Sequence, residues 1–123
     1  MLVVPTYAAA SPIQGIGLFA AAPILKGTLI WRFEPGFDRI IPDEVFRRLP
    51  EVARAFVDRY GYITPQIPGG WVVSLDNTRF INHSDTPNTD NTTPLTYARR
   101  DIAKDEEITC DYGEFCDSYD LTS

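Results

Sequence analysis

The clearest periodicity in the chain is helical and lies between Pro42 and Tyr60. Pro50 falls within this region, and because proline fits the first turn of a helix but not its interior, it should divide the region into two short helices. Gly61 can end the second one. We therefore expect a helical insert at about residues 42–61, with its apolar positions in the core. Those positions recur every three or four residues, the spacing of one helix face: Val45, Phe46, Leu49, Val52, Phe56, Val57 and Tyr60.

Short β-rich runs separated by Gly, Pro and Asp make up most of the remaining chain. Such punctuation is typical of small sheets joined by tight connections. The pattern therefore predicts a mainly β fold around one helical insert. The runs are LVVPTY near the start, TLIWRF at 28–33, WVVSL at 71–75, LTYA at 95–98 and EITCDY at 107–112.

The chain also contains an internal similarity between ILKGTLI at 24–30 and IAKDEEI at 102–108. Each copy starts with Ile, carries Lys two residues later, continues with a turn residue and ends on Ile. This is typical of a turn that leads into a strand with its Lys exposed. Two copies are too few for a solenoid. They suggest two similar β units in one compact fold, with the helical insert between them.

The length and charge narrow the choice of partners. A chain of 123 residues, 44% hydrophobic and 23% charged, fits one globular domain. The formal net charge is −6, and after Lys104 the chain has seven acidic residues and no Lys or Arg. Acidic surface repels phosphate backbones and attracts cations, so we expect a basic protein or peptide as partner and no direct nucleic acid contact. The alternative is that this surface only aids solubility.

No targeting or membrane segment is predicted. The start, MLVVPTYAAASP, lacks a basic region and a long apolar run, and no other segment could span a bilayer. Cys110 and Cys116 are too close in sequence to link distant parts of a fold, which favours a reducing compartment. We therefore expect a cytoplasmic protein without a membrane partner.

GIGLFA at 15–20 matches the dinucleotide-binding pattern Gly-x-Gly-x-x-Ala. That pattern works when a helix follows and points its N-terminus at a pyrophosphate. Pro23 and then Lys26-Gly27 interrupt any such helix, so a dinucleotide site is not expected. The glycines could still let the backbone approach another ligand closely, or form a plain β-turn.

Metal and hydrolase chemistry are also poorly supported. A metal site needs three or four placed ligands, and one His with two Cys leaves only carboxylates to complete it, so we expect no metal. A hydrolytic triad would need His83 as its base. Ser84, the adjacent residue, would point away from His83 in an extended chain.

The segment RFINHSDTPNTD at 79–90 begins like a strand and then gathers small hydrogen-bonding side chains around the chain's one histidine. Such a segment could hold a small polar ligand through its backbone and through Asn82 and His83, near the tyrosine of DYG at 111–113. A satisfied structural network is the alternative account of the same residues.

Three motifs, taken together, resemble one family in the order in which that family carries them. GIGLFAAAPILKGTLI resembles the opening of a SET domain. RFINHSDTPNTD resembles its Arg-Phe-x-Asn-His-Ser-x-x-Pro-Asn signature, and DEEITCDYGEF resembles its closing Glu-x-x-x-Asp-Tyr-Gly segment. The resemblance runs from about Pro12 to Phe115. It implies one SET domain over residues 1–123, with a β-clip architecture of small sheets and a C-terminal pseudoknot.

The resemblance also implies an activity, methyl transfer from S-adenosylmethionine to the side-chain amine of lysine, with S-adenosylhomocysteine as product. The substrate would be a basic protein such as a histone or histone-like protein, through which the chain could associate with a nucleoid or chromatin. Tyr112 matches the catalytic tyrosine of the family. The residues expected to line the lysine channel are Cys110, Tyr60, Tyr62, Tyr97 and Phe115. The residues expected at the cofactor, His83 through its backbone, are Gly15, Ile16, Gly17, Leu18, Phe19, Asn82, His83 and Tyr112.

Two departures from the family pattern matter. Many relatives close the lysine channel with a cysteine-zinc segment after DYG, which this sequence does not show, so residues 114–123 or a second subunit of a homodimer should cover it. Cys110 occupies a position that is often Phe or Tyr in the family, and its smaller side chain predicts di- or trimethylation. The alternatives to an enzyme are a catalytically silent SET-like module and a β-clip domain that binds carbohydrate or protein.

Overall fold

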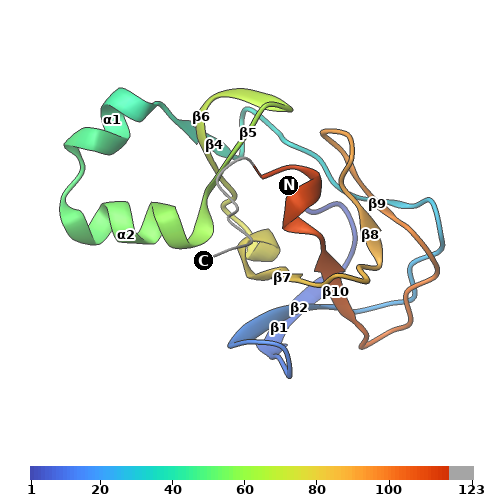
Figure 1. The fold of residues 1–123 in the computed structure, drawn as a ribbon. Coiled ribbons are helices and arrows are strands. Elements are labelled where there is room, and N and C mark those ends of the chain that lie inside the picture. Colours follow the sequence, from blue (N-terminus) through green and yellow to red (C-terminus); the bar gives the residue numbers. More distant parts are fainter. Residues whose placement is uncertain (117–123) are drawn as a thin grey trace.

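The computed structural model describes residues 1–116, and it confirms a mainly β fold with a short helical insert (Figure 1). The helices are α1 (Asp43–Arg48), α2 (Glu51–Tyr60) and two single 3₁₀ turns, η1 (Asn77–Phe80) and η2 (Tyr112–Glu114). The strands are β1 (Thr6–Ala10), β2 (Ile16–Ala20), β3 (Leu29–Trp31), β4 (Arg39–Ile41), β5 (Tyr62–Thr64), β6 (Ile67–Val73), β7 (Asn82–His83), β8 (Thr89–Asp90), β9 (Thr96–Ala98) and β10 (Glu107–Cys110).

Within residues 1–116 the strands form three small sheets, with strand orders β1-β2-β10-β7, β3-β9-β8 and β4-β6-β5. The helices stand at one side of the molecule next to the β4-β6-β5 sheet, and the β3-β9-β8 sheet lies on the other side (Figure 1). β7 runs parallel to β10, which places Asn82 opposite Thr109 and His83 opposite Cys110. The polar segment and the DYG segment, far apart in sequence, therefore lie side by side.

The two similar sequence segments pair with each other. Ile24 and Ile102 form an antiparallel bridge in which each backbone N–H donates to the other carbonyl at 2.8 Å. The closing isoleucines of the two copies, Ile30 and Ile108, are both fully buried in the main core. The internal similarity therefore corresponds to two related β units that share one core.

The turn of each unit also contacts the other unit in the same way. Gly27 and Asp105 occupy equivalent places and both have positive φ, 85° and 68°. The backbone N–H of Gly27 donates to Ala98 O at 2.8 Å, and that of Asp105 donates to Ala20 O at 2.7 Å. Asp105 is the non-glycine residue with positive φ among those described, and Asp tolerates this conformation better than most residues.

Pro50 separates the two predicted helices and stands at the N-cap of α2, while Gly61 follows its last turn. The expectation that all apolar positions of the insert are core is wrong for Val52, which is 79% exposed, and Phe56, which is 47% exposed. Only the face of α2 that carries Val57 packs, in a small second core with Trp71 and Val73.

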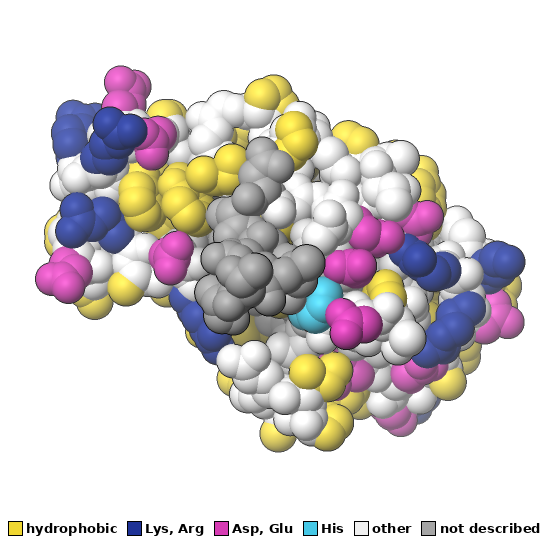
Figure 2. Space-filling model, viewed as in Figure 1, with side chains coloured by type: hydrophobic (Ala, Val, Ile, Leu, Met, Phe, Trp, Pro, Cys, Tyr) yellow, Lys and Arg dark blue, Asp and Glu magenta, His cyan; other side chains and the backbone are white. Residues whose placement is uncertain are grey.

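The helical insert leaves its other face open because it stands at the edge of the molecule (Figure 1). In the space-filling view of one face, hydrophobic side chains reach the surface beside the helices (Figure 2). No helix within residues 1–116 is long and apolar enough to cross a bilayer.

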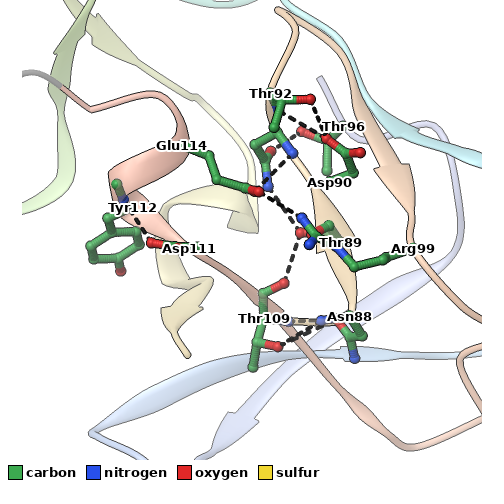
Figure 3. Close-up of polar contacts among 12 residues, drawn as sticks. Asn88, Thr89, Asp90, Thr92, Thr96, Arg99, Thr109, Asp111, Tyr112 and Glu114 are labelled. Carbon is green, nitrogen blue, oxygen red and sulfur yellow. Dashed lines mark hydrogen bonds and ion pairs between the residues drawn. The ribbon is translucent and has the colours of Figure 1, made fainter. Parts of the chain in front are cut away.

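Buried polar side chains bind the polar segment to β10 (Figure 3). The side chain of Asn88, which is 1% exposed, accepts from Thr109 N at 2.9 Å and donates to Glu107 O at 2.8 Å. Thr89 Oγ1 donates to Thr109 O at 2.7 Å. Because β7 also pairs with β10, the segment 82–89 is held against this strand at both of its ends. Dense hydrogen bonding of this kind is consistent with the predicted pseudoknot.

Candidate active site

Tyr112, the predicted catalytic residue, is held at both its backbone and its hydroxyl. Asp111 precedes η2 and accepts from Gly113 N at 2.8 Å, which caps the turn. The Tyr112 N–H donates to His83 Nδ1 at 3.1 Å, and its hydroxyl donates to Ile81 O at 2.7 Å. Both partners flank or belong to β7, so the RFINHS segment fixes the position of this tyrosine.

The ring of His83 supports Tyr112 and, among residues 1–116, belongs to the wall of neither of the two cavities that contain Tyr112. Since Nδ1 accepts from a backbone N–H, the ring proton of the neutral form belongs on Nε2, which lies 2.9 Å from Asp85 Oδ1. The two rings of His83 and Tyr112 are 5.3 Å apart. Ser84 Oγ meets Thr86 Oγ1 at 3.4 Å.

Two cavities in the described part of the chain meet at Tyr112 and Ile81. The first, here called the hairpin cavity, has a volume of about 350 Å³ and includes the turn between β1 and β2 in its wall. The second, here called the central cavity, has a volume of about 230 Å³, and Tyr62, Cys110 and Phe115 are among the residues that line it. The residues that line both are Arg59, Tyr60, Arg79, Ile81 and Tyr112.

The hairpin cavity combines a polar amide with cationic and aromatic groups. Gly15, Ile16 and Asn82 line one part of it. At the other part the guanidinium groups of Arg59 and Arg79 lie 5.8 and 5.9 Å from the centre of the Tyr60 ring. Such a cavity suits a ligand with an anionic carboxylate and an aromatic base.

Of the glycine-rich segment predicted at the cofactor, Gly15 and Ile16 line the hairpin cavity, while the next three residues do not. Leu18 is fully buried in the main core, and Phe19 stacks on Tyr7 with 5.6 Å between ring centres. A Cβ on Gly17 would come within 2.4 Å of Glu107 Oε2. The need for glycine at position 17 is therefore a packing requirement.

Aromatic rings and a small thiol line the central cavity. Tyr62 and Phe115 meet edge to face at 5.0 Å, and Phe115 meets Tyr112 at 6.2 Å. Cys110, 5% exposed, lies among them. Burial raises the pKa of the Cys110 thiol and of the Tyr62 hydroxyl, so both groups stay protonated at neutral pH.

Of the remaining predicted channel residues, Tyr60 lines the central cavity and Tyr97 does not. Tyr97 lies on β9 next to Thr96, which does line the cavity. Successive side chains of a strand point to opposite faces, so the neighbour of a lining residue points away.

Sequence reasoning missed several residues of the site. Ile81 takes part through its carbonyl, which no side-chain pattern reveals. Arg79 belongs to the RFINHS motif, but the motif alone gave it no role. Arg59 lies on the helical insert and belongs to no motif that indicates a function. Within residues 1–116 no group of three His, Cys, Asp or Glu side chains gathers as a metal ion would require.

Comparisons with known proteins agree with this geometry. The model of the SET domain family matches residues 15–113 of the chain. Comparison with curated proteins gave no significant match. A Plasmodium falciparum protein to which histone methyltransferase activity is attributed superposes with a TM-score of 0.63, at 28% identity, over 89% of this chain and 94% of that one.

Two structures of the Chaetomium thermophilum Polycomb Repressive Complex 2 share the fold at lower identity. The form bound to S-adenosylmethionine has a TM-score of 0.67 and 22% identity over 94% of this chain. A humanized mutant bound to the inhibitor GSK126 has a TM-score of 0.68 and 21% identity, also over 94%. In both, the matched region is 16% of the longer chain.

The chain belongs to the SET domain family, since the family model covers most of its length. SET domains are a family of protein lysine methyltransferases that use S-adenosylmethionine. The mainly β architecture with small sheets and a helical insert is that of SET-domain structures.

Proposed function

We propose that this chain transfers a methyl group from S-adenosylmethionine to the side-chain amine of lysine in a basic protein. The observation that carries the proposal is the meeting of the hairpin and central cavities at Tyr112 and Ile81. A cofactor in one cavity and a lysine side chain in the other would bring their reacting atoms together at that junction. Alignment of this kind can supply much of the rate of a bimolecular reaction.

The residues of the hairpin cavity fit the cofactor by their chemistry. Arg59 and Arg79 offer guanidinium groups for a carboxylate, and Asn82 offers an amide for an amino group. Tyr60 and Phe80 offer aromatic surface. The volume of about 350 Å³ lies within the usual range for small-molecule sites. When bound, the cofactor would supply a methyl group on a positively charged sulfur.

Tyr112 and Ile81 would position the attacking amine. The Tyr112 hydroxyl donates its proton to Ile81 O, so toward any further group at the junction its oxygen can act only as an acceptor. An acceptor there can hold an N–H of the amine and so direct the nitrogen lone pair toward the methyl group.

The walls of the central cavity would favour the neutral amine. Free lysine has a pKa of about 10.4 and must lose its proton before it can attack. Tyr62, Phe115 and Cys110 present aromatic and thiol surface that solvates an ammonium poorly, so burial shifts the equilibrium toward the amine. The same rings can hold a methylated, cationic product through cation–π attraction.

A basic protein substrate such as a histone fits the charge of the chain. Acidic side chains lie beside the histidine on one face of the molecule (Figure 2). Independently of that view, carboxylate oxygens of Asp85 and Asp111 lie 2.9 and 3.8 Å from the ring nitrogens of His83. The activity attributed to the Plasmodium relative supports the same substrate class. Direct nucleic acid binding is not proposed, because the net charge is −6.

We also propose that residues 114–123, or a second copy of the chain, cover the central cavity. Residues 117–123 lie outside the described part, and Phe115 and Cys116 line the cavity. A homodimer could also bury the exposed apolar side chains of Val52 and Phe56, and the Phe56 ring lies 5.0 Å from that of Tyr60, which lines the cavity. Sedimentation that shows an active monomer would exclude the homodimer.

The alternative function is a catalytically silent module that binds cofactor or peptide. Calorimetry with S-adenosylmethionine, followed by incubation with lysine-rich basic proteins and mass spectrometry, separates the possibilities. The enzyme should bind the cofactor and methylate lysine. Binding without transfer to any substrate favours the silent module, and no binding at all would contradict the cofactor assignment and favour a β-clip domain of another function.

A further inference from the structure

A carboxylate outside the hairpin cavity organises the cavity wall. Glu107 lies at the start of β10, with its backbone paired to Phe19 of β2. Its carboxylate accepts from Ser11 Oγ at 2.8 and 2.9 Å and from Asn82 Nδ2 at 2.9 Å. It also occupies the space that a side chain at Gly17 would need. Glu107 therefore joins three separate segments that surround the cavity.

The surroundings of Asn82 decide which way its side-chain amide is turned. Besides Glu107, Nδ2 faces Ser11 Oγ at 3.1 Å and the backbone carbonyls of Gln14 at 3.1 Å and Ile16 at 3.4 Å. A carboxylate and two carbonyls carry no hydrogen, and the Ser11 hydroxyl proton is engaged by Glu107. The amide NH₂ must face this group, because the reversed amide would set its oxygen against acceptors.

The amide oxygen is then turned the other way. Asn82 lines the hairpin cavity, and its hydrogen bonds to other side chains and carbonyls of residues 1–116 are all made by Nδ2 and none by Oδ1. An oxygen in that position can accept a hydrogen bond from an ammonium group and cannot serve as a donor to an anion. The side chain therefore selects a cationic amine over a carboxylate at this point of the cavity.

We propose that Glu107 is a positioning residue: it holds the Asn82 amide so that Oδ1 accepts from the α-ammonium group of the cofactor. This inference rests on the proposed function, because it assumes that S-adenosylmethionine occupies the hairpin cavity. The negative charge of Glu107 adds to the effect, since a charge-assisted bond fixes the amide more firmly than a neutral one. Ser11 completes the arrangement by binding Glu107 and the loop that leads to Gly15.

The test compares two ligands that differ only in the group concerned. S-adenosylhomocysteine carries the α-amino group, and its deaminated analogue has hydrogen in that place. Calorimetric titration of both into the wild type and into Glu107→Gln and Glu107→Ala gives the ratio of their affinities for each protein. Glu106→Gln is the matched control, because the neighbouring carboxylate pairs with Arg100 at 2.6 Å and does not line the cavity.

We expect the wild type to prefer the amino-bearing ligand by about tenfold or more, the value of one charge-assisted hydrogen bond. Glu107→Ala should lower this ratio several-fold by weakening the amino-bearing ligand alone, and Ser11 and the two carbonyls that remain near Nδ2 should preserve part of the preference. Glu107→Gln should lie between, because an amide still offers Asn82 one acceptor. The control should match the wild type.

Other outcomes would overturn the inference. If Glu107→Ala weakens both ligands equally, Glu107 only supports the loop, and if the ratio stays at its wild-type value in both variants, Asn82 is oriented without it. Glu107→Gln preserves size and shape, so it still gives an answer if the alanine variant does not fold. A wild type that binds neither ligand contradicts the proposed function itself.

Discussion

The hydroxyl of Tyr112 donates a hydrogen bond of 2.7 Å to the backbone carbonyl of Ile81, at the junction of the two cavities. One partner follows β10 and the other precedes β7, and these two strands pair in parallel. Because the acceptor is a backbone atom held by that pairing, the position of the hydroxyl depends on the fold as much as on Tyr112. The chemistry proposed for the chain depends on this contact.

The size of Cys110 should set how many methyl groups are added. Cys110 lines the central cavity and leaves room beside Tyr112 that a larger side chain would fill. We expect di- or trimethyl-lysine from the wild type and only monomethyl-lysine from Cys110→Phe, as measured by mass spectrometry of the product.

The matched control for this substitution is Cys110→Ala, which keeps the space open and should retain multiple methylation. Added bulk in a packed region costs about 1–3 kcal/mol, so the folding of Cys110→Phe needs to be checked by circular dichroism. Monomethyl-lysine as the sole wild-type product would contradict the prediction.

Asn88 should be critical for stability and not for binding. Its side chain, which lies outside both cavities, bonds Thr109 N and Glu107 O in the interior. Removing it leaves both groups buried without a partner, so we expect Asn88→Ala to lower the free energy of unfolding by about 2–4 kcal/mol. Urea denaturation measures this loss. Asn77→Ala, at an exposed position, should change it by less than about 0.5 kcal/mol.

The thiol of Cys110 should make the protein less stable in alkali. Burial raises its pKa in the folded state, whereas the unfolded thiol ionises near pH 8.5. The unfolded state therefore releases this proton first as the pH rises, and unfolding is favoured. Between pH 8 and pH 10 this should lower the free energy of unfolding of the wild type by about 2 kcal/mol. Cys110→Ala has no thiol at this position and should not show this loss.

Urea denaturation of the wild type and of Cys110→Ala at several pH values checks this expectation. Tyr62 should add a similar effect only above about pH 10, because the unfolded phenol ionises there. The difference in free energy of unfolding between the wild type and Cys110→Ala could instead stay constant from about pH 8 to pH 10. That result would show that the Cys110 thiol ionises equally in the folded and the unfolded state.

Substitution of Gly27 should lower the stability of the fold through its backbone conformation and not through a steric clash. An added Cβ would meet no atom within 4 Å, yet φ is 85°. Gly27→Ala should therefore cost about 1–2 kcal/mol through strain. Gly36→Ala is the control, since it also meets open space but has no positive φ, and it should be neutral or slightly stabilising. Equal thermal stability of the two variants would contradict this account.

The parts of the fold that the sequence predicted are those with a local pattern. The period of the apolar residues around Pro50 predicted both helices, and the repeated Ile-x-Lys pattern predicted two related β units. The exposure of Val52 could not be predicted, because it depends on where the insert stands relative to the sheets. β7 and β8 are two residues long each, too short for any alternation to be seen.

Residues of the candidate site could be predicted from the sequence only where their side chains belong to a motif. Asn82 and Tyr112 were found through such motifs, and both line the hairpin cavity. Ile81 was not predicted, because its backbone carbonyl and not its side chain contacts Tyr112. Tyr97 was predicted from its aromatic side chain alone. It follows Thr96 on β9, and because Thr96 lines the central cavity, the side chain of Tyr97 points away from it.

The most direct test of the proposed function is transfer of labelled methyl from S-adenosylmethionine to a panel of lysine-rich basic proteins, with wild type and Tyr112→Phe side by side. Loss of one positioned hydroxyl should reduce transfer by about a hundredfold while cofactor binding persists. Label on lysine from the wild type, with that loss in the variant, is the predicted result. Equal transfer by both proteins, or cofactor binding without transfer to any substrate, would contradict the account.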